Sequence, residues 1–111
     1  MNWKILDNID QLDQIKQLSH EKPCVIFKHS TRCSISSMAK LRLEDDWDLS
    51  EDQLVPYYLD LIANRPISNA IAERFDVFHE SPQVILIQKG ECTYDESHLG
   101  ISVSELKGML V

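Results

Sequence analysis

Two short apolar runs constrain the fold of this chain more than any other feature. Cys24–Phe27 and Val84–Ile87 are each four residues long, and each begins within two residues after a proline. Runs of this length are too short for a buried helix and are typical of strands covered on both faces. A sheet with such strands needs helices on both faces, so the sequence predicts an α/β domain.

Helix and strand signals alternate along the rest of the chain. The predicted elements are a helix opened by Asn8 and ended by Pro23, a strand at Cys24–Phe27, a helix from near Cys33 toward Asp46, a strand at Leu54–Ile62, a helix from Pro66, strands at Val84–Ile87 and Cys92–Glu96, and a helix opened by Ser102. Pro56 indicates that its strand lies at an edge or that the strand starts there.

This order defines the expected topology. A right-handed βαβ unit makes the first two strands parallel, and a hairpin turn at Lys89–Glu91 adds an antiparallel pair. The order is that of a thioredoxin-like fold. We therefore expect one domain over residues 1–111, with a four-stranded mixed β-sheet flanked by helices on both faces.

Charge and hydropathy exclude several classes of function. The net charge of −7 argues against binding to nucleic acid or to an anionic membrane surface, both of which require a basic face. No segment approaches the about 18 to 20 apolar residues that cross a bilayer. The first residues also lack an apolar signal core, so the expected protein is a soluble, cytoplasmic monomer.

Basic residues gather in one window of this acidic chain. Between Lys22 and Leu43 there is no Asp or Glu, and five of the eleven basic residues fall there. They are Lys22, Lys28, Arg32, Lys40 and Arg42. Such a basic island suits a small anionic ligand. Alternatively, Lys40 and Arg42, about 200° apart on a helix, only solvate its surface.

The cysteines point to thiol chemistry rather than to disulfides or metals. Cys24, Cys33 and Cys92 are odd in number and widely spaced, which fits neither a secreted disulfide framework nor a zinc site. Cys33 lies where a buried strand meets the next helix, and thiols at helix N-termini tend to have a lowered pKa. We expect Cys33 to be the catalytic nucleophile, Cys24 a core residue and Cys92 unreactive, with no bound metal or cofactor.

The residues around Cys33 indicate a one-cysteine mechanism. A dithiol oxidoreductase carries a second cysteine three residues on, and here that residue is Ser36, which can donate to a thiolate but cannot attack a disulfide. Ser81-Pro82 precedes the second apolar run, where this fold keeps a cis-proline near the nucleophile. His29 either assists proton transfer or has a structural role, and His79 and Glu80 are further candidates for the lining of the site.

Three segments together resemble the monothiol bacilliredoxins, thioredoxin-like proteins of the bacillithiol system. They are Phe27–Ser36, Glu80–Ile85 and Ser97-His98, and the resemblance covers essentially the whole chain. The family's active site is Thr-Cys-Pro-Ile-Ser, so Arg32 replaces its threonine and Ser34 its proline. The loss of that proline is expected to loosen the start of the helix.

The resemblance implies that Cys33 removes bacillithiol from bacillithiolated client proteins and is then freed by a low-molecular-weight thiol. Bacillithiol would act as a thiol co-substrate, and its carboxylates suit the basic island. The residues expected to bind the substrate are Thr31, Arg32, Ser34, Ser36, Ser81 and Pro82.

Two other functions remain open. One is a redox-inert interaction module with this fold. The other is an iron–sulfur carrier resembling the monothiol glutaredoxins, although their Cys-Gly-Phe-Ser site has a glycine and a phenylalanine that are absent here.

Overall fold

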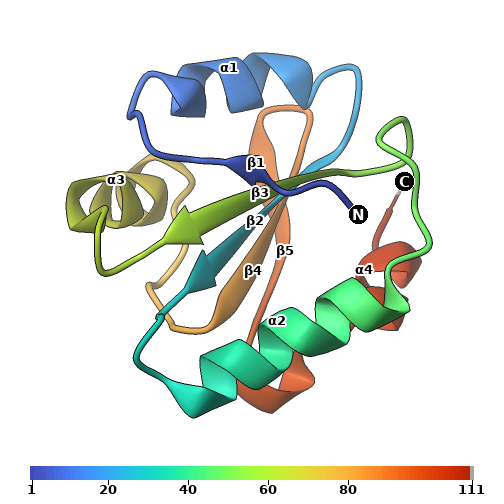
Figure 1. The fold of residues 1–111 in the computed structure, drawn as a ribbon. Coiled ribbons are helices and arrows are strands. Elements are labelled where there is room, and N and C mark those ends of the chain that lie inside the picture. Colours follow the sequence, from blue (N-terminus) through green and yellow to red (C-terminus); the bar gives the residue numbers. More distant parts are fainter. Residues whose placement is uncertain (111) are drawn as a thin grey trace.

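Five strands form one mixed sheet in the order β1-β3-β2-β4-β5 in a computed structural model, which describes residues 1–110 (Figure 1). Strand β2 pairs in parallel with β3 and antiparallel with β4, and β4 pairs antiparallel with β5. The elements are β1 (Lys4–Ile5), α1 (Gln11–Leu18), β2 (Cys24–His29), α2 (Ser34–Asp46), β3 (Val55–Asp60), α3 (Arg65–Arg74), β4 (Gln83–Gln88), β5 (Glu91–Ser97), the 3-10 helix η1 (His98–Gly100) and α4 (Val103–Gly108).

The thioredoxin-like α/β fold is confirmed, but the sheet has five strands rather than the four expected. The additional strand β1 pairs in parallel with β3 through Lys4 and Ile5, opposite Tyr57 and Tyr58. Two residues are too few to produce the alternating pattern by which a strand is recognised in a sequence. An edge strand of this length can therefore be recognised only from its pairing with β3 in the structure.

Pro56 lies near the start of β3, as the sequence predicted. The Val55 N–H donates to the Pro23 carbonyl at 2.9 Å, so this residue bonds on the β2 side. Successive residues of a strand turn their backbone groups to opposite sides, which directs the Pro56 nitrogen toward β1. Pairing with β1 begins only opposite Tyr57, and the missing donor therefore costs no ladder bond.

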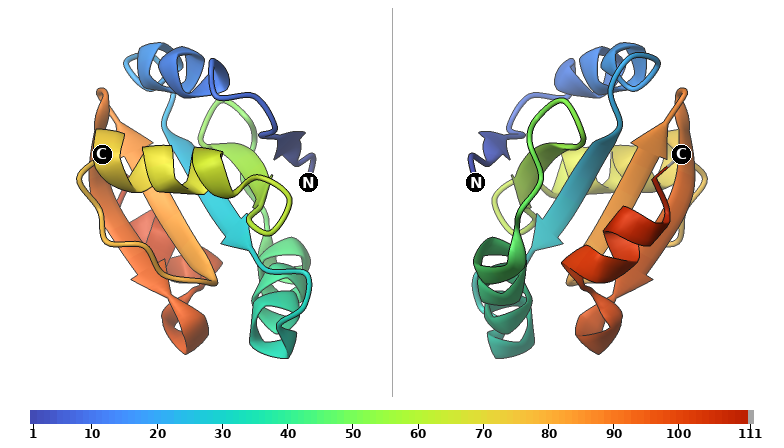
Figure 2. Two further views of the ribbon diagram at one scale, coloured as in Figure 1. Left: turned by 90° about the vertical axis from the view of Figure 1, so that its left-hand side faces the viewer. Right: turned by 90° about the vertical axis from the view of Figure 1, so that its right-hand side faces the viewer.

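Helices cover both faces of the sheet, as the two buried strands require (Figure 2). One core cluster joins Leu12 and Ile15 of α1 and Ile71 of α3 to one face. The other joins α2 and α4 to the opposite face, for example through Leu43 and Leu106. Alternate residues of β2 and β4 serve the two clusters, which explains why both strands are apolar along their length.

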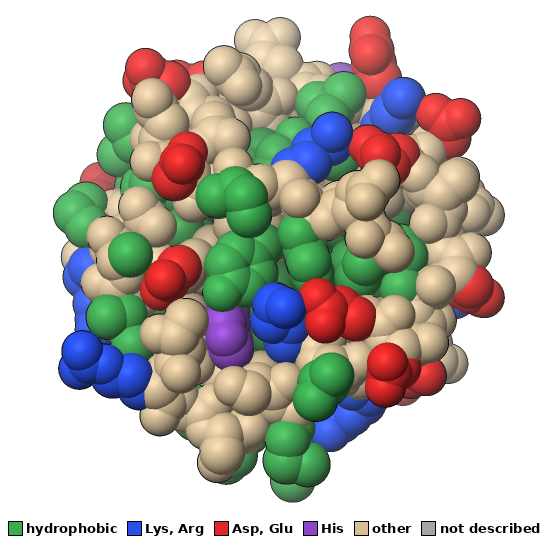
Figure 3. Space-filling model, in the orientation of Figure 1, with side chains coloured by type: hydrophobic (Ala, Val, Ile, Leu, Met, Phe, Trp, Pro, Cys, Tyr) green, Lys and Arg blue, Asp and Glu red, His purple; other side chains and the backbone are tan. Residues whose placement is uncertain are grey.

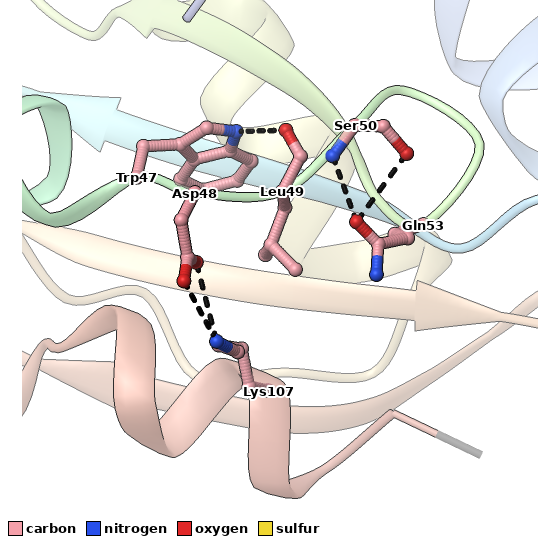
Figure 4. Close-up of polar contacts among 6 residues, drawn as sticks. All are labelled: Trp47, Asp48, Leu49, Ser50, Gln53 and Lys107. Carbon is pink, nitrogen blue, oxygen red and sulfur yellow. Dashed lines mark hydrogen bonds and ion pairs between the residues drawn. The ribbon is translucent and has the colours of Figure 1, made fainter.

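The segment that follows α2 anchors α4 (Figure 4). The Trp47 indole N–H donates to the Leu49 carbonyl at 3.0 Å, and the Ser50 N–H donates to Gln53 Oε1 at 2.9 Å. Asp48 between them forms an ion pair with Lys107 of α4 at 2.9 Å. Ser102 Oγ accepts from the Glu105 N–H at 3.1 Å and caps the same helix, which confirms the Ser102 half of the capping box predicted there.

Among residues 1–110 the core contains one charged side chain, Lys28 of β2, which has no exposed surface. Its Nζ donates to the Ser68 carbonyl of α3 at 3.2 Å and lies 3.2 Å from His79 Nδ1. No carboxylate pairs with it among the described residues. Burial therefore lowers the pKa of Lys28 to about 8.

This buried amine predicts a specific dependence of stability on pH. The unfolded chain holds the Lys28 proton up to its ordinary pKa of 10.5, whereas the folded chain gives it up near 8. The contribution of Lys28 to stability is therefore least favourable below about pH 8 and improves as the pH rises toward 10.5. In Lys28→Met this contribution is absent, so the variant should be more stable than the wild type by about 1–3 kcal/mol at neutral pH.

Denaturant unfolding of both proteins as a function of pH measures this difference. The advantage of Lys28→Met should shrink steadily above about pH 8. Lys16→Met, which alters an exposed lysine, is the matched control and should show no such trend. A constant difference between Lys28→Met and wild type across the pH range would contradict the predicted linkage.

Candidate active site

Four loops converge at one end of the sheet, where the central strands begin or finish. The register pairs Lys28 with Gln83, so the end of β2 lies beside the start of β4. The Leu61 N–H after β3 donates to the His29 carbonyl at 2.9 Å. The His98 N–H after β5 donates to the Pro82 carbonyl at 3.1 Å. The segments expected to form the site are thus brought to one place.

Cys33 is the N-cap residue of α2, as expected from its place between strand and helix. Its backbone is extended, with φ −114° and ψ 122°, and its side chain is half-buried. The Cys33 carbonyl accepts from the Ser37 N–H at 3.1 Å and so begins the helix. No acidic residue lies in the first turn. The positive end of the helix dipole therefore faces a thiol without a competing carboxylate on that turn.

Ser36 is fully buried one turn beyond Cys33. Its Oγ accepts from the Ser30 N–H at 3.0 Å and lies 2.6 Å from Nδ1 of His29, which is also buried. The His29 ring stacks on Phe27, with a centroid distance of 5.7 Å. Burial, together with the charge of Lys40, lowers the pKa of His29 from its usual value, so the ring is neutral at neutral pH.

The peptide bond between Ser81 and Pro82 is cis. Pro82 is buried, and Ser81 is half-buried with an enclosed hydroxyl that has no hydrogen-bond partner among residues 1–110. An unsatisfied buried hydroxyl is uncommon in folded proteins. Ser81 therefore leaves an unused donor and acceptor in the loop that faces the site.

The remaining predicted site residues, Thr31, Arg32 and Ser34, are exposed around Cys33. Of the five basic residues in the window, only Arg32 makes no ion pair or hydrogen bond within residues 1–110. The others are engaged elsewhere: Lys28 in the core, Lys22 with Asp52, Lys40 with Glu44, and Arg42 with the carbonyls of Leu99 and Ile101. The prediction of a basic island is therefore wrong, and Figure 3 shows acidic and basic side chains interspersed over one face.

The other two thiols lie at the opposite end of the sheet. Cys24 is paired with Ile87, and Ile87 with Cys92, far from the loops that hold Cys33. Burial raises the pKa of Cys24 to about 12. Burial and the nearby Asp95 raise the pKa of Cys92 as well. Within residues 1–110 all three thiols are free, and no group of three or more His, Cys, Asp or Glu is placed to hold a metal ion.

Two histidines near the site have different surroundings. His29 contacts Ser36 on the face that carries α2, whereas His79 contacts Lys28 on the face that carries α3. The sequence left both roles of His29 open. Alternation along β2 places His29 on the same face as Phe27, and this signal could have directed attention to a contact with α2.

The fold and the position of the thiol define a class, the thioredoxin-fold thiol oxidoreductases. One similar structure is a candidate oxidoreductase with a thioredoxin fold, at 31% identity and a TM-score of 0.77, covering 95% of this chain and 90% of that chain. Thioredoxin from Malassezia sympodialis is 18% identical with a TM-score of 0.74, over 96% of this chain and 86% of that one. Thioredoxin from Trypanosoma brucei brucei is 13% identical with a TM-score of 0.73, over 97% and 87%.

The family is more specific than the fold. The sequence profile of the monothiol bacilliredoxin BrxC family matches residues 4–106 of this chain. The chain belongs to that family, as the resemblance of its motifs indicated. Over residues 1–110, no helix has the length and apolar character needed to cross a membrane.

The three thiols are predicted to differ in reactivity. At about pH 7 iodoacetamide should modify Cys33 at least tenfold faster than Cys24 or Cys92, because only thiolates react and burial raises the pKa of the other two. Peptide mass spectrometry after timed labelling from about pH 5 to about pH 10 measures all three rates in one sample. Equal labelling of Cys33 and Cys92 at neutral pH would be inconsistent with this assignment.

Proposed function

We propose that this protein removes bacillithiol from bacillithiolated cysteines of client proteins by monothiol thiol–disulfide exchange at Cys33. The observation that carries the proposal is the isolation of an accessible thiol at a helix N-terminus. Ser36 occupies the position of an internal resolving cysteine. Cys24 is too distant to take that role, because it begins β2 and this strand alone spans about 20 Å toward the site. The proposal places this reaction in the cytoplasm, where small thiols keep protein cysteines reduced.

The first step transfers the bacillithiol to Cys33. The Cys33 thiolate attacks the bacillithiol sulfur of the mixed disulfide, a new S–S bond forms, and the client cysteine leaves as a thiolate. A low-molecular-weight thiolate then attacks the bacillithiol sulfur held on Cys33. The products are a disulfide of the two small thiols and the Cys33 thiolate, so electrons and protons balance over the cycle.

Helix α2 contributes mainly to the second step. The rate of thiol–disulfide exchange rises when the leaving sulfur is a more stable thiolate. The N-terminus of α2 stabilises negative charge on Cys33, which favours its departure from the adduct. Regeneration by an external thiol is thus the step that gains from this geometry.

The substrate would lie across the converging loops. Arg32 is exposed next to Cys33 and is the basic side chain of the window that remains available to the carboxylates of bacillithiol. Thr31 and Ser34 offer exposed hydroxyls on either side of the thiol. Ser81 offers its backbone and its unpartnered hydroxyl, and the adjacent Pro82 is buried.

Transfer from a bacillithiolated client tests the proposal. The wild type should release the client thiol and gain one bacillithiol adduct that maps to Cys33 by intact-mass and peptide analysis. Cys33→Ala should abolish transfer, because no other thiol lies at this end of the sheet. Cys24→Ala and Cys92→Ala are the matched controls and should retain most of the rate.

Two outcomes of this experiment would overturn the proposal. Unchanged transfer in Cys33→Ala would remove the mechanism, and equal rates with bacillithiolated and glutathionylated clients would remove the specificity. An absence of any adduct on the wild type would favour the redox-inert module. A coloured protein after anaerobic reconstitution with iron and sulfide would favour the iron–sulfur carrier.

Arg32 should contribute to the choice between small thiols. An exposed ion pair contributes about 0.2 to 1 kcal/mol, so Arg32→Ser should lower the rate with a bacillithiolated client about 1.4- to 5-fold. The loss should diminish at high salt, because exposed charges are screened. Lys16→Ser is the control for net charge, since Lys16 lies on α1, away from the site. A salt-independent loss would argue against contact between Arg32 and the carboxylates.

A further inference from the structure

Phe78, on the segment between α3 and β4, is the most exposed large hydrophobic residue within residues 1–110, at 92%. Its backbone is nevertheless held in place. The Phe78 carbonyl accepts from Nε2 of the buried Gln83 at 2.9 Å, and Gln83 Oε1 accepts from the Glu80 N–H at 3.2 Å. An aromatic side chain that stands out from an anchored backbone is typical of a surface that contacts a partner.

The way in which α3 ends brings this segment back beside the helix. The Val77 N–H donates to the Ala72 carbonyl at 3.1 Å, and the intervening Asp76 has a positive φ of 52°. This is the Schellman ending of a helix, and aspartate is one of the few residues that adopt the left-handed conformation. Figure 2 (left) shows the chain then running down beside the sheet to the start of β4.

A cavity of about 360 Å³ is formed by α3 together with this returning segment. Helix α3 contributes residues three and four apart, which therefore share one face: Asn69, Ala72 and Glu73. The returning segment contributes four consecutive residues: Asp76, Val77, Phe78 and His79. The volume lies at the lower end of the range for ligand sites, which suits a single long side chain better than a cofactor.

The lining of this cavity is negatively charged at neutral pH. The carboxylates of Glu73 and Asp76 make no ion pair or hydrogen bond within residues 1–110. Burial, together with the charges of Lys28 and Arg65, lowers the pKa of His79, so its ring is uncharged there. No lysine or arginine within residues 1–110 lines the cavity. Two free carboxylates next to an aromatic ring attract a cation.

The cavity is continuous with the loop of the candidate active site. Phe78 comes three residues before Ser81 in the chain. On the other side of the loop the His98 N–H donates to the Pro82 carbonyl at 3.1 Å, and the next residue, Leu99, is 74% exposed. The two most exposed large hydrophobic residues within residues 1–110 thus flank the Ser81-Pro82 loop. A polypeptide that brings a disulfide to this loop meets them, so the expected occupant of the cavity belongs to that polypeptide.

We propose that the cavity lined by Glu73, Asp76 and Phe78 binds a lysine or arginine side chain that lies near the modified cysteine of the client protein. The carboxylates pair with the cation, and the Phe78 ring covers it. The contact is non-covalent and gives clients with basic segments an advantage over clients with acidic ones. The identity of the client rests on the proposed function, whereas the affinity of the cavity for a cation requires no disulfide.

Nuclear magnetic resonance of the nitrogen-labelled protein tests the cavity without any client. N-acetyl-arginine methylamide should shift the amide signals of the lining residues saturably, and its citrulline analogue, which has nearly the same shape without the charge, should not. Glu73→Gln and Asp76→Asn should each weaken the affinity about 1.4- to 5-fold, as expected for exposed ion pairs. Asparagine also accepts the left-handed backbone of position 76.

The aromatic contribution has its own variant and the charge its own control. Phe78→Ala should weaken the affinity about two- to fivefold while leaving the net charge unchanged. Asp45→Asn removes one exposed carboxylate of α2 that does not line the cavity and should leave the affinity as it is. Equal shifts with the citrulline analogue, or unchanged affinity in Phe78→Ala, refute the proposal. A loss in Asp45→Asn equal to that in Glu73→Gln refutes it too, because it reveals only a general attraction to an acidic protein.

Transfer from bacillithiolated peptides tests the assignment to the client. In peptides that differ in one residue, moved stepwise along the segment on either side of the cysteine, arginine should give a higher kcat/KM than citrulline or glutamate at some position. This preference should fall about two- to fivefold in Phe78→Ala. Transfer without any preference for arginine refutes this proposal and leaves the proposed function intact. If no peptide is turned over, the proposed function fails, and binding of the same peptides without bacillithiol decides the cavity by the same comparison.

Discussion

The hydrogen bond from the Ser30 N–H to Ser36 Oγ joins the end of β2 to the first turn of α2, and the geometry of the site depends on it. The Cys33 N–H also donates to the Ser30 carbonyl at 3.1 Å, which closes the turn that carries Cys33. The same oxygen contacts His29, which the stacked Phe27 ring holds in place. The position of the thiol is therefore set by the core face of β2 as much as by the helix that follows.

Local chemistry was sufficient to predict most of the fold. Val84–Ile87 could be recognised because a four-residue apolar run has few alternatives, and the last helix because Ser102 and Glu105 have capping-box spacing. The strand β1 could not be predicted, because Lys4 and Ile5 are both exposed and carry no pattern of their own. The true end of β2 was hidden for a different reason. Lys28 and His29 are buried continuations of the strand, but a polar pair there indicates its end.

Some features of the site could likewise be predicted from the sequence, and others could not. The placement of Cys33 follows from residues adjacent in sequence, so it could be predicted. The basic island could not be judged, because the acidic partner of Lys22 is Asp52, thirty residues further along a chain whose folding brings the two together. The contact between His29 and Ser36 could be predicted only in part. Each residue was singled out, but only the packing of α2 on β2 shows that one bonds to the other.

The two edges of the sheet differ in form, and both discourage pairing with another chain. On one side β1 offers a strand of only two residues. On the other side β5 carries Glu91, Thr93 and Asp95 as exposed residues along its length. Short or charged edge strands are poor templates for the addition of further strands. Edge-to-edge association between copies of the chain is therefore disfavoured, which suits a protein whose chemistry depends on how often one thiol meets a disulfide.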